Sequence, residues 1–74
     1  MNANPVILQM KYARIVNLFA ELAKINPLEA LDFFYKSEEY KLISRGVGDL
    51  HCMSDGYLAE DLLIEFNNAK DNKN

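Results

Sequence analysis

The residues best suited to chemistry are His51 and Cys52, which stand side by side between Asp49 and Asp55. A thiol nucleophile needs a base directed at it and a cleft for the substrate, and a zinc site usually needs four ligands. One cysteine and one histidine at adjacent positions point in different directions and meet neither requirement. Because free cysteines usually act as small hydrophobic residues, we expect Cys52 to be buried and inert, and His51 to be hydrogen-bonded in a loop.

Two pairs of adjacent acids are Glu38-Glu39 and Glu60-Asp61. A di-metal carboxylate bundle needs a glutamate followed three residues later by a histidine on facing helices, and that spacing does not occur. We therefore expect the first pair to occupy the first turn of a helix, and Glu60, Asp61 and Glu65 to face water. The sequence predicts no catalytic residue, no metal ligand and no cofactor.

Aromatic side chains gather at residues 33–35 and at Tyr40. Three consecutive aromatic residues cannot all face one side of a helix, so at least one should lie near the surface. The alternatives are a small core that buries all of them and an exposed anchor for a partner, since aromatic residues dominate binding hot spots. The candidate partner-binding residues are Phe33, Tyr35 and Tyr40, together with Leu18.

The elements that carry these residues are predicted to be helices. Residues 5–24 give the strongest pattern, with apolar residues at alternating steps of four and three, the period of one helical face. That stripe is Leu8, Tyr12, Ile15, Phe19 and Leu22. Small apolar residues widen it on one side and Leu18 widens it on the other. This helix is therefore either the centre of the fold or part of a homodimer interface.

Two short helices are predicted next, over residues 27–36 and 38–45. Asn26 and Ser37 are typical residues for capping their starts, and Gly46 suits the position after the second helix. The pair could form a helix-turn-helix. However, the start of the supposed recognition helix is acidic, which disfavours contact with DNA phosphates.

The last helix is predicted from Ser54-Asp55 to about residue 68. Its buried stripe is Leu58, Leu62 and Phe66. In the connection before it, Leu50 and Met53 are expected to point inward. The polar end, residues 67–74, is expected to fray.

The composition is that of one globular domain over residues 1–74, with an ordered core over about residues 5–68. Half of the residues are hydrophobic and 26% are charged, as in folded proteins. No strand pattern appears, so we expect an all-α fold, a small irregular or orthogonal bundle of about four helices. A single cysteine, and no leader or long uncharged apolar stretch, predict a cytoplasmic protein without membrane contact.

The net charge of −3 is uneven, because residues 25–66 hold nine acids and three bases. An acidic body disfavours nucleic acid and favours a basic protein surface, although acids also keep small proteins soluble. The first hypothesis is a non-catalytic module that binds a protein partner. The alternative is a small transcriptional regulator with Lys11, Arg14 and Lys24 as a weak basic stripe. A thiol- or metal-dependent enzyme ranks third.

Three stretches resemble a small bacterial domain-of-unknown-function family: QMKYAR at residues 9–14, ALDFFYKS at 30–37 and LHCMSD at 50–55. The resemblance spans most of residues 5–66. It implies no catalytic residue, because the family has none assigned, and a small residue such as threonine in place of Cys52 among its members. Genes of this family often lie beside one for an ADP-ribosyltransferase-like protein. The resemblance therefore implies a toxin–antitoxin or effector–immunity arrangement, with this protein as an antitoxin-like partner of the neighbouring enzyme.

Overall fold

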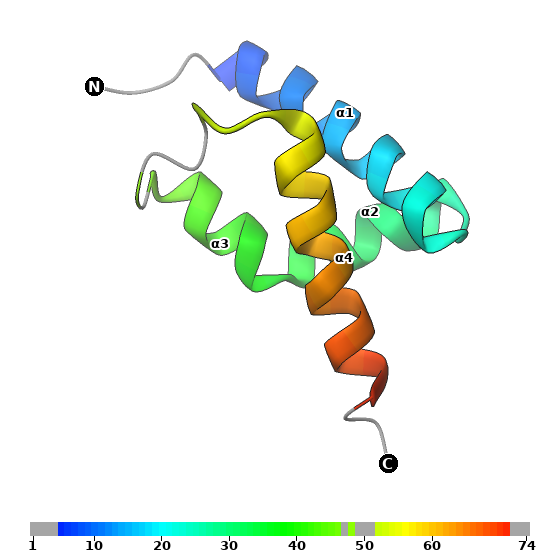
Figure 1. Cartoon of the computed structure of the whole chain (residues 1–74). Helices are drawn as coiled ribbons and strands as arrows, with labels where there is room; N and C mark the ends of the chain where they lie inside the picture. The colour runs from blue at the N-terminus through cyan, green and yellow to red at the C-terminus, as the bar shows by residue number, and fades with distance from the viewer. Residues whose placement is uncertain (1–4, 47, 49–51, 72–74) are drawn as a thin grey trace.

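The computed structural model describes residues 5–46, 48 and 52–71, and this part of the chain forms four helices (Figure 1). They are α1 (Pro5–Ala23), α2 (Pro27–Lys36), α3 (Glu38–Ser44) and α4 (Asp55–Asp71). No strand occurs among the described residues. The predicted all-α bundle of about four helices is confirmed.

Side-chain caps begin three of the helices and confirm the starts predicted from the sequence. The Asn26 Oδ1 atom accepts hydrogen bonds from the backbone N–H groups of Leu28 at 2.7 Å and Glu29 at 3.2 Å. The Ser37 and Ser54 hydroxyls accept from N–H groups three residues later in α3 and α4, each at 3.1 Å. Each bond satisfies a donor that the first turn of a helix leaves without an internal partner.

α1 ends at Ala23 because Lys24 adopts a left-handed conformation, with φ of 59°. The backbone N–H of Ile25 donates to the Ala20 carbonyl at 3.1 Å, which is the hydrogen bond of a Schellman motif. Ile25 then packs against the core. A side chain in this conformation costs roughly 1 kcal/mol, which is why glycine usually occupies such positions.

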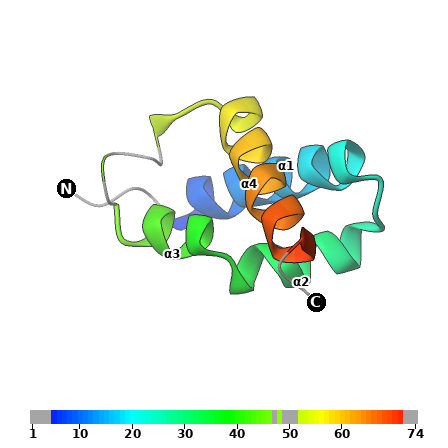
Figure 2. The same ribbon diagram turned by 60° about the horizontal axis from the view of Figure 1, so that its bottom comes forward.

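The core lies where the helices meet around α1. Figure 2 shows α4 crossing in front of α1, with α2 beneath and α3 to one side. α1 packs against α2 and α4, and α3 contacts the same two helices. The buried apolar side chains are Tyr12, Ile15, Val16, Phe19, Ala20, Ala30, Phe34, Ile43, Leu58, Ala59 and Leu62. The removal of this apolar surface from water is the main force that holds the bundle together.

The central position of α1 explains its wide apolar face. Val16 and Ala20, on one side of the predicted stripe, are buried together with its centre. On the other side Leu18 is 37% exposed, and Leu22, the last residue of the stripe, is 44% exposed. The centre of the stripe is therefore buried within one chain, while its C-terminal end is not.

The connection between α3 and α4 runs over the surface, as connections usually do. Cys52 and Met53 are both exposed, so the expectations of a buried thiol and an inward-pointing methionine are wrong. The Lys11 Nζ atom donates a 2.7 Å hydrogen bond to the Met53 carbonyl, which holds the connection against α1. The predictions for Leu50 and His51 fall outside the described residues.

α4 continues to Asp71, past its predicted end near residue 68. No glycine or proline follows residue 66 to stop it, and Lys70 adds positive charge to the last turn, where the helix dipole favours it. The Lys70 ammonium also lies over the Phe66 ring, 5.4 Å from the centroid. Residues 67–71 are therefore part of the helix, and the expectation that the polar end frays stays a prediction.

Two ion pairs join the first residue of α4 to α1. The Asp55 carboxylate accepts from Lys11 Nζ at 2.8 Å and from Arg14 Nε at 2.6 Å. The Lys11 and Asp55 side chains are only 13% and 23% exposed, so water screens this pair less than an ordinary surface pair. Hydrogen bonds from Lys11 and then Arg14 hold the pKa of Asp55 below its ordinary value of 3.8.

Replacing Lys24 by glycine should stabilise the protein. Glycine adopts the left-handed conformation without strain, although the unfolded chain also gains freedom. We therefore expect the free energy of unfolding to rise by about 0.5 to 1 kcal/mol. Urea unfolding followed by circular dichroism measures the change. Lys24→Ala is the control, because it removes the same charge but keeps the Cβ atom; an equal gain in both variants would contradict the conformational explanation.

Asp55→Asn should destabilise the protein at neutral pH, and the effect should disappear in acid. Losing both ion pairs should lower the free energy of unfolding by about 1 to 2 kcal/mol near neutral pH. The stabilisation by Asp55 is present above pH 3.8 and is lost as the pH falls through the lowered folded-state pKa. Urea titrations at several pH values should show the variant and the parent converging in acid.

The matched control for this prediction is Asp32→Asn. That substitution breaks the Asp32–Lys36 pair, whose side chains are 66% and 74% exposed. Exposed pairs contribute little, so this variant should stay within about 0.5 kcal/mol of the parent protein. A gap between Asp55→Asn and the parent that persists unchanged in acid would show that the charge of Asp55 is not the cause.

Candidate functional site

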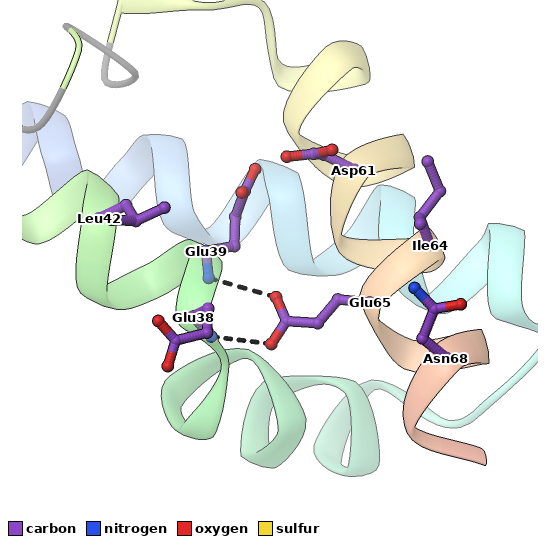
Figure 3. A pocket seen from close by; sticks show the side chains of 7 residues that line it. All are labelled: Glu38, Glu39, Leu42, Asp61, Ile64, Glu65 and Asn68. Atoms are coloured by element: carbon purple, nitrogen blue, oxygen red, sulfur yellow. Dashed lines mark hydrogen bonds between the residues drawn. The ribbon is translucent and has the colours of Figure 1, made fainter. Parts of the chain in front are cut away.

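A hollow of about 310 Å³ lies between α3 and α4 (Figure 3). Its lining residues are Glu38, Glu39, Leu42, Asp61, Ile64, Glu65 and Asn68. Four of the seven carry carboxyl groups, and none is basic. We call this site the acidic hollow.

Helical spacing places these residues on facing sides of two helices. In α4, Asp61, Ile64, Glu65 and Asn68 follow one another at steps of three, one and three, so they share one side of the helix. In α3, Leu42 follows the two glutamates of the first turn by three and four residues. The acidic hollow therefore lies where these two sides of α3 and α4 face each other.

Glu65 makes the contact that brings the two helices together. Its carboxylate accepts from the backbone N–H of Glu38 at 2.8 Å and from that of Glu39 at 3.2 Å, as the dashed lines in Figure 3 show. These N–H groups lie in the first turn of α3, where they have no partner within the helix. The Glu65 carboxylate of α4 thus caps the start of α3, and each of its two oxygens accepts one hydrogen bond in this contact.

Glu39 lies at the inner wall of the acidic hollow and is only 4% exposed. Its Oε2 atom is buried and accepts no hydrogen bond from an N–H or hydroxyl group; the Glu39 carboxyl instead shares a hydrogen bond with the Asp61 carboxyl, which requires a proton on one of the two. Figure 3 shows the Glu39 side chain extending toward Asp61 of α4. Burial first, then hydrogen bonding with Asp61 and the charges of Asp61 and Glu65, raise the pKa of Glu39 from 4.5 to about 8. Glu39 therefore keeps its proton at neutral pH.

The expectation that Glu60, Asp61 and Glu65 face water is wrong for two of them: Asp61 and Glu65 are half-buried, whereas Glu60 is exposed as predicted. Glu38 and Glu39 lie in the first turn of α3 as predicted, and Glu39 is buried there. A signal was present in the sequence, because Asp61 and Glu65 each follow a leucine of the buried stripe by three residues. That spacing puts Asp61 and Glu65 on the same helical face as the buried stripe. Their position on this face, and not their residue type, determines that they are partly buried.

The predicted partner-binding residues do not form one site. Phe33 is half-buried and packs against phenylalanine rings of α1 and α4. Tyr40 is half-buried against Tyr12, with ring centroids 5.6 Å apart. Tyr35 is 42% exposed and meets Tyr40 edge to face at 4.9 Å. The structure thus brings Tyr35 and Tyr40 together, while Phe33 belongs to the core and Leu18 lies on α1.

The described residues contain no group of three or more His, Cys, Asp or Glu side chains that could hold a metal ion. A protonated carboxyl beside a second carboxylate is also an arrangement that enzymes use for acid catalysis. A catalytic acid must come within hydrogen-bond distance of the reacting atom, and the Glu39 Oε2 atom is closed off from solvent. The acidic hollow is therefore better suited to holding a positively charged group than to transferring a proton to a substrate.

Comparison with known proteins gives no match: no family model, no curated protein and no solved structure corresponds to this chain. Within the described part of the chain, no helix combines the length and the apolar character needed to cross a membrane. The function has to be inferred from the surface of the protein itself.

Glu39→Gln should make the protein more stable at alkaline pH than the parent. The folded protein binds the Glu39 proton more tightly than the unfolded chain does. The free energy of unfolding of the parent therefore falls as the pH rises from about 4.5 through about 8. Glutamine does not titrate, so the variant avoids this loss. We expect the free energy of unfolding of Glu39→Gln to exceed that of the parent by on the order of 2 kcal/mol at about pH 9. This is less than the full pKa shift implies, because an ionised Glu39 can rotate toward water.

Urea unfolding at acidic, neutral and alkaline pH tests this expectation. The matched control is Glu60→Gln, which removes one negative charge from the exposed side of α4 and should keep the pH dependence of the parent. If Glu39→Gln also keeps that dependence, Glu39 does not retain its proton in the folded protein.

Proposed function

We propose that the protein is a non-catalytic interaction module that binds a basic segment of another protein in the acidic hollow. The observation that carries the proposal is the lining of the hollow, which holds four carboxyl groups and no basic side chain. Charges arranged in this way favour a partner of opposite sign and exclude acidic partners. A hollow open to solvent between two helices is also accessible to a peptide segment.

The charges of the acidic hollow are only partly balanced by the chain itself. Glu38 pairs with Lys41 at 3.3 Å, on the exposed side of α3. Glu65 is engaged by the backbone of α3. No ion pair to Glu39 or Asp61 occurs among the described residues. Glu39 keeps its proton and carries no charge at neutral pH, so a basic side chain from a partner would balance the charge of Asp61.

The apolar part of the lining suits the same kind of ligand. Leu42 is half-buried and Ile64 is 58% exposed, and both line the hollow beside the acids. Lysine and arginine side chains lay their aliphatic stems on apolar surface while the charged end contacts polar groups. The acidic hollow offers both kinds of surface within one site.

The alternative of a transcriptional regulator is weakened by the ion pairs of α1. Lys11 and Arg14, two members of its supposed basic stripe, are both bound to Asp55. The single Asp55 carboxylate balances one of these two positive charges, so the stripe presents less charge to a phosphate. The start of α3 is acidic as well, and an acidic helix end repels phosphates.

The biological setting of such a module is a further proposal. The family resemblance suggests an antitoxin-like partner of a neighbouring ADP-ribosyltransferase-like enzyme, in the cytoplasm of a bacterium. Pairing of two copies through α1 also stays a hypothesis, supported by Leu18 and Leu22, which are 37% and 44% exposed and lie one turn apart. Tyr35 remains a candidate for a second contact with a partner.

A short peptide of alternating arginine and serine should bind the protein, whereas an acidic peptide of equal length and duplex DNA should not. We expect micromolar binding that weakens roughly tenfold when salt is raised from low to physiological concentration, because screening acts on exposed charge. Amide chemical shifts in a titration followed by nuclear magnetic resonance should move mainly in α3 and α4.

Two matched variants locate the binding site. Asp61→Asn should weaken binding of the basic peptide, while Glu60→Gln, which removes the same charge from the exposed side of α4, should not. Equal weakening in both variants, or shifts spread over all four helices, would mean that the peptide senses only the overall acidity of the protein.

A further inference from the structure

α2 carries an apolar stripe that the described part of the chain leaves largely exposed. Leu28, Leu31 and Tyr35 follow one another at steps of three and four, so they share one side of the helix. Their exposed fractions are 76%, 37% and 42%. We call these three residues the α2 stripe. Apolar side chains that lie together on a surface, rather than singly, mark a contact with another molecule.

The rest of α2 already supplies all that the core of one chain needs. Ala30 and Phe34 lie on another side of the helix and are completely buried, and the Phe34 ring contacts Tyr12 of α1 with centroids 5.4 Å apart. Seven of the ten residues of α2 are apolar. A helix that is apolar nearly all round is usually covered all round, so the α2 stripe is an apolar surface beyond what the fold requires.

The charges beside the α2 stripe indicate what covers it. Glu29, Asp32 and Lys36 each follow a residue of the stripe by one position, so they line one edge of it. Asp32 and Lys36 pair at 3.1 Å, and their side chains are 66% and 74% exposed. The two acids lie toward the start of α2 and the base lies at its end. This edge is complementary to a second copy of itself that runs in the opposite direction.

The two possible directions of such a pairing differ in charge. In an antiparallel pair, Lys36 of each copy lies near the acids of the other copy. A parallel pair would bring the acids of both copies together, and like charges repel. An antiparallel pair is also what a twofold axis across the helix produces, with the same patch used by both copies.

The aromatic end of the α2 stripe is fixed before any contact forms. The Tyr35 ring meets the Tyr40 ring edge to face at 4.9 Å and lies 5.4 Å from the Phe34 ring. A side chain that is already held in place loses little freedom on association. In the antiparallel pair, Tyr35 of one copy lies toward the leucine end of the other stripe, so a ring covers aliphatic surface at both ends of the contact.

We propose that two copies of the protein associate through the α2 stripe, with the two α2 helices antiparallel about a twofold axis. The inference goes beyond the proposed function, because no residue of the stripe or its charged edge lines the acidic hollow. The dimer and the binding of a basic partner can therefore fail independently of each other.

The size of the contact sets its strength. A helix of ten residues is only about 15 Å long, and a stable interface usually buries about 800 Å² on each partner. The α2 stripe offers less than this, so the dimer should be weak, with a dissociation constant on the order of 100 micromolar.

Sedimentation equilibrium of the whole chain tests the dimer. Between about 10 micromolar and about 1 millimolar protein, the average mass of the parent should rise from that of one 8.5 kDa chain toward twice that value. Leu28→Glu should weaken association at least roughly tenfold, because it places two like charges in an apolar contact. Leu18→Glu is the matched control on α1 and should associate like the parent. Circular dichroism should show that both variants keep their helices, since both leucines are exposed.

Reversal of charge tests the antiparallel arrangement. Lys36→Glu makes the edge of the stripe wholly acidic, and the double variant Glu29→Lys, Asp32→Lys makes it wholly basic. Each of these proteins alone should associate roughly fivefold more weakly than the parent, because like charges then face each other. An equimolar mixture of the two should associate at least as tightly as the parent, at the same total concentration.

Three results would overturn the proposal. A parent protein that keeps the mass of one chain at about 1 millimolar forms no such dimer. A dimer that Leu18→Glu dissociates and Leu28→Glu does not is formed through α1. A dimer that Leu28→Glu dissociates, but for which the charge-reversed mixture associates no better than its components, does not have antiparallel α2 helices.

Discussion

α3 has only seven residues, and a helix of this length is not stable alone in water. The Glu65 carboxylate of α4 satisfies two backbone N–H groups at its start, and the Ser37 hydroxyl satisfies a third. This contact fixes where α3 begins and which side of it faces α4. Glu39, held in that first turn, is thereby pressed against Asp61. The acidic hollow is thus a consequence of how α3 is capped.

α4 takes part in two contacts through acidic side chains, and the contributions of these contacts to stability respond to pH in opposite directions. Asp55, at its first residue, stabilises the fold only while it is ionised, so acid removes its contribution. Glu39, beside Asp61 in the middle of α4, favours the fold only while it is protonated, so alkali removes its contribution. These two groups alone would place the maximum of stability in mildly acidic solution, between their two transitions.

Local signals in the sequence predicted most of the fold. Asn26, Ser37 and Ser54 act as the caps that their positions indicated, because capping depends on neighbours a few residues away. The helical period likewise identified nearly all of the buried positions in α1. Met53 was predicted to point inward but is 40% exposed. It lies in the connection before α4, where no helical period indicates which residues are buried.

The acidic hollow was missed for a related reason. Asp61 and Glu65 were assigned to solvent from their residue type, although their spacing from Leu58 and Leu62 put them on the buried face. The partner of Glu65 is the backbone of a helix 26 and 27 residues away in the chain. A sequence pattern does not reveal a long-range acceptor for backbone donors. The burial of Glu39 beside Asp61 likewise depends on both helices being in place.

The state of Glu39 bears on why a glutamate occupies this position. Burying a carboxyl group beside other acids lowers stability, and an apolar residue of similar size would avoid that cost. Residues that lower stability in this way are frequent where a protein binds a ligand. The three neighbouring acids make the cost larger and attract the same ligand more strongly. The feature that weakens the free protein is therefore the one that would make a bound cation stabilise it.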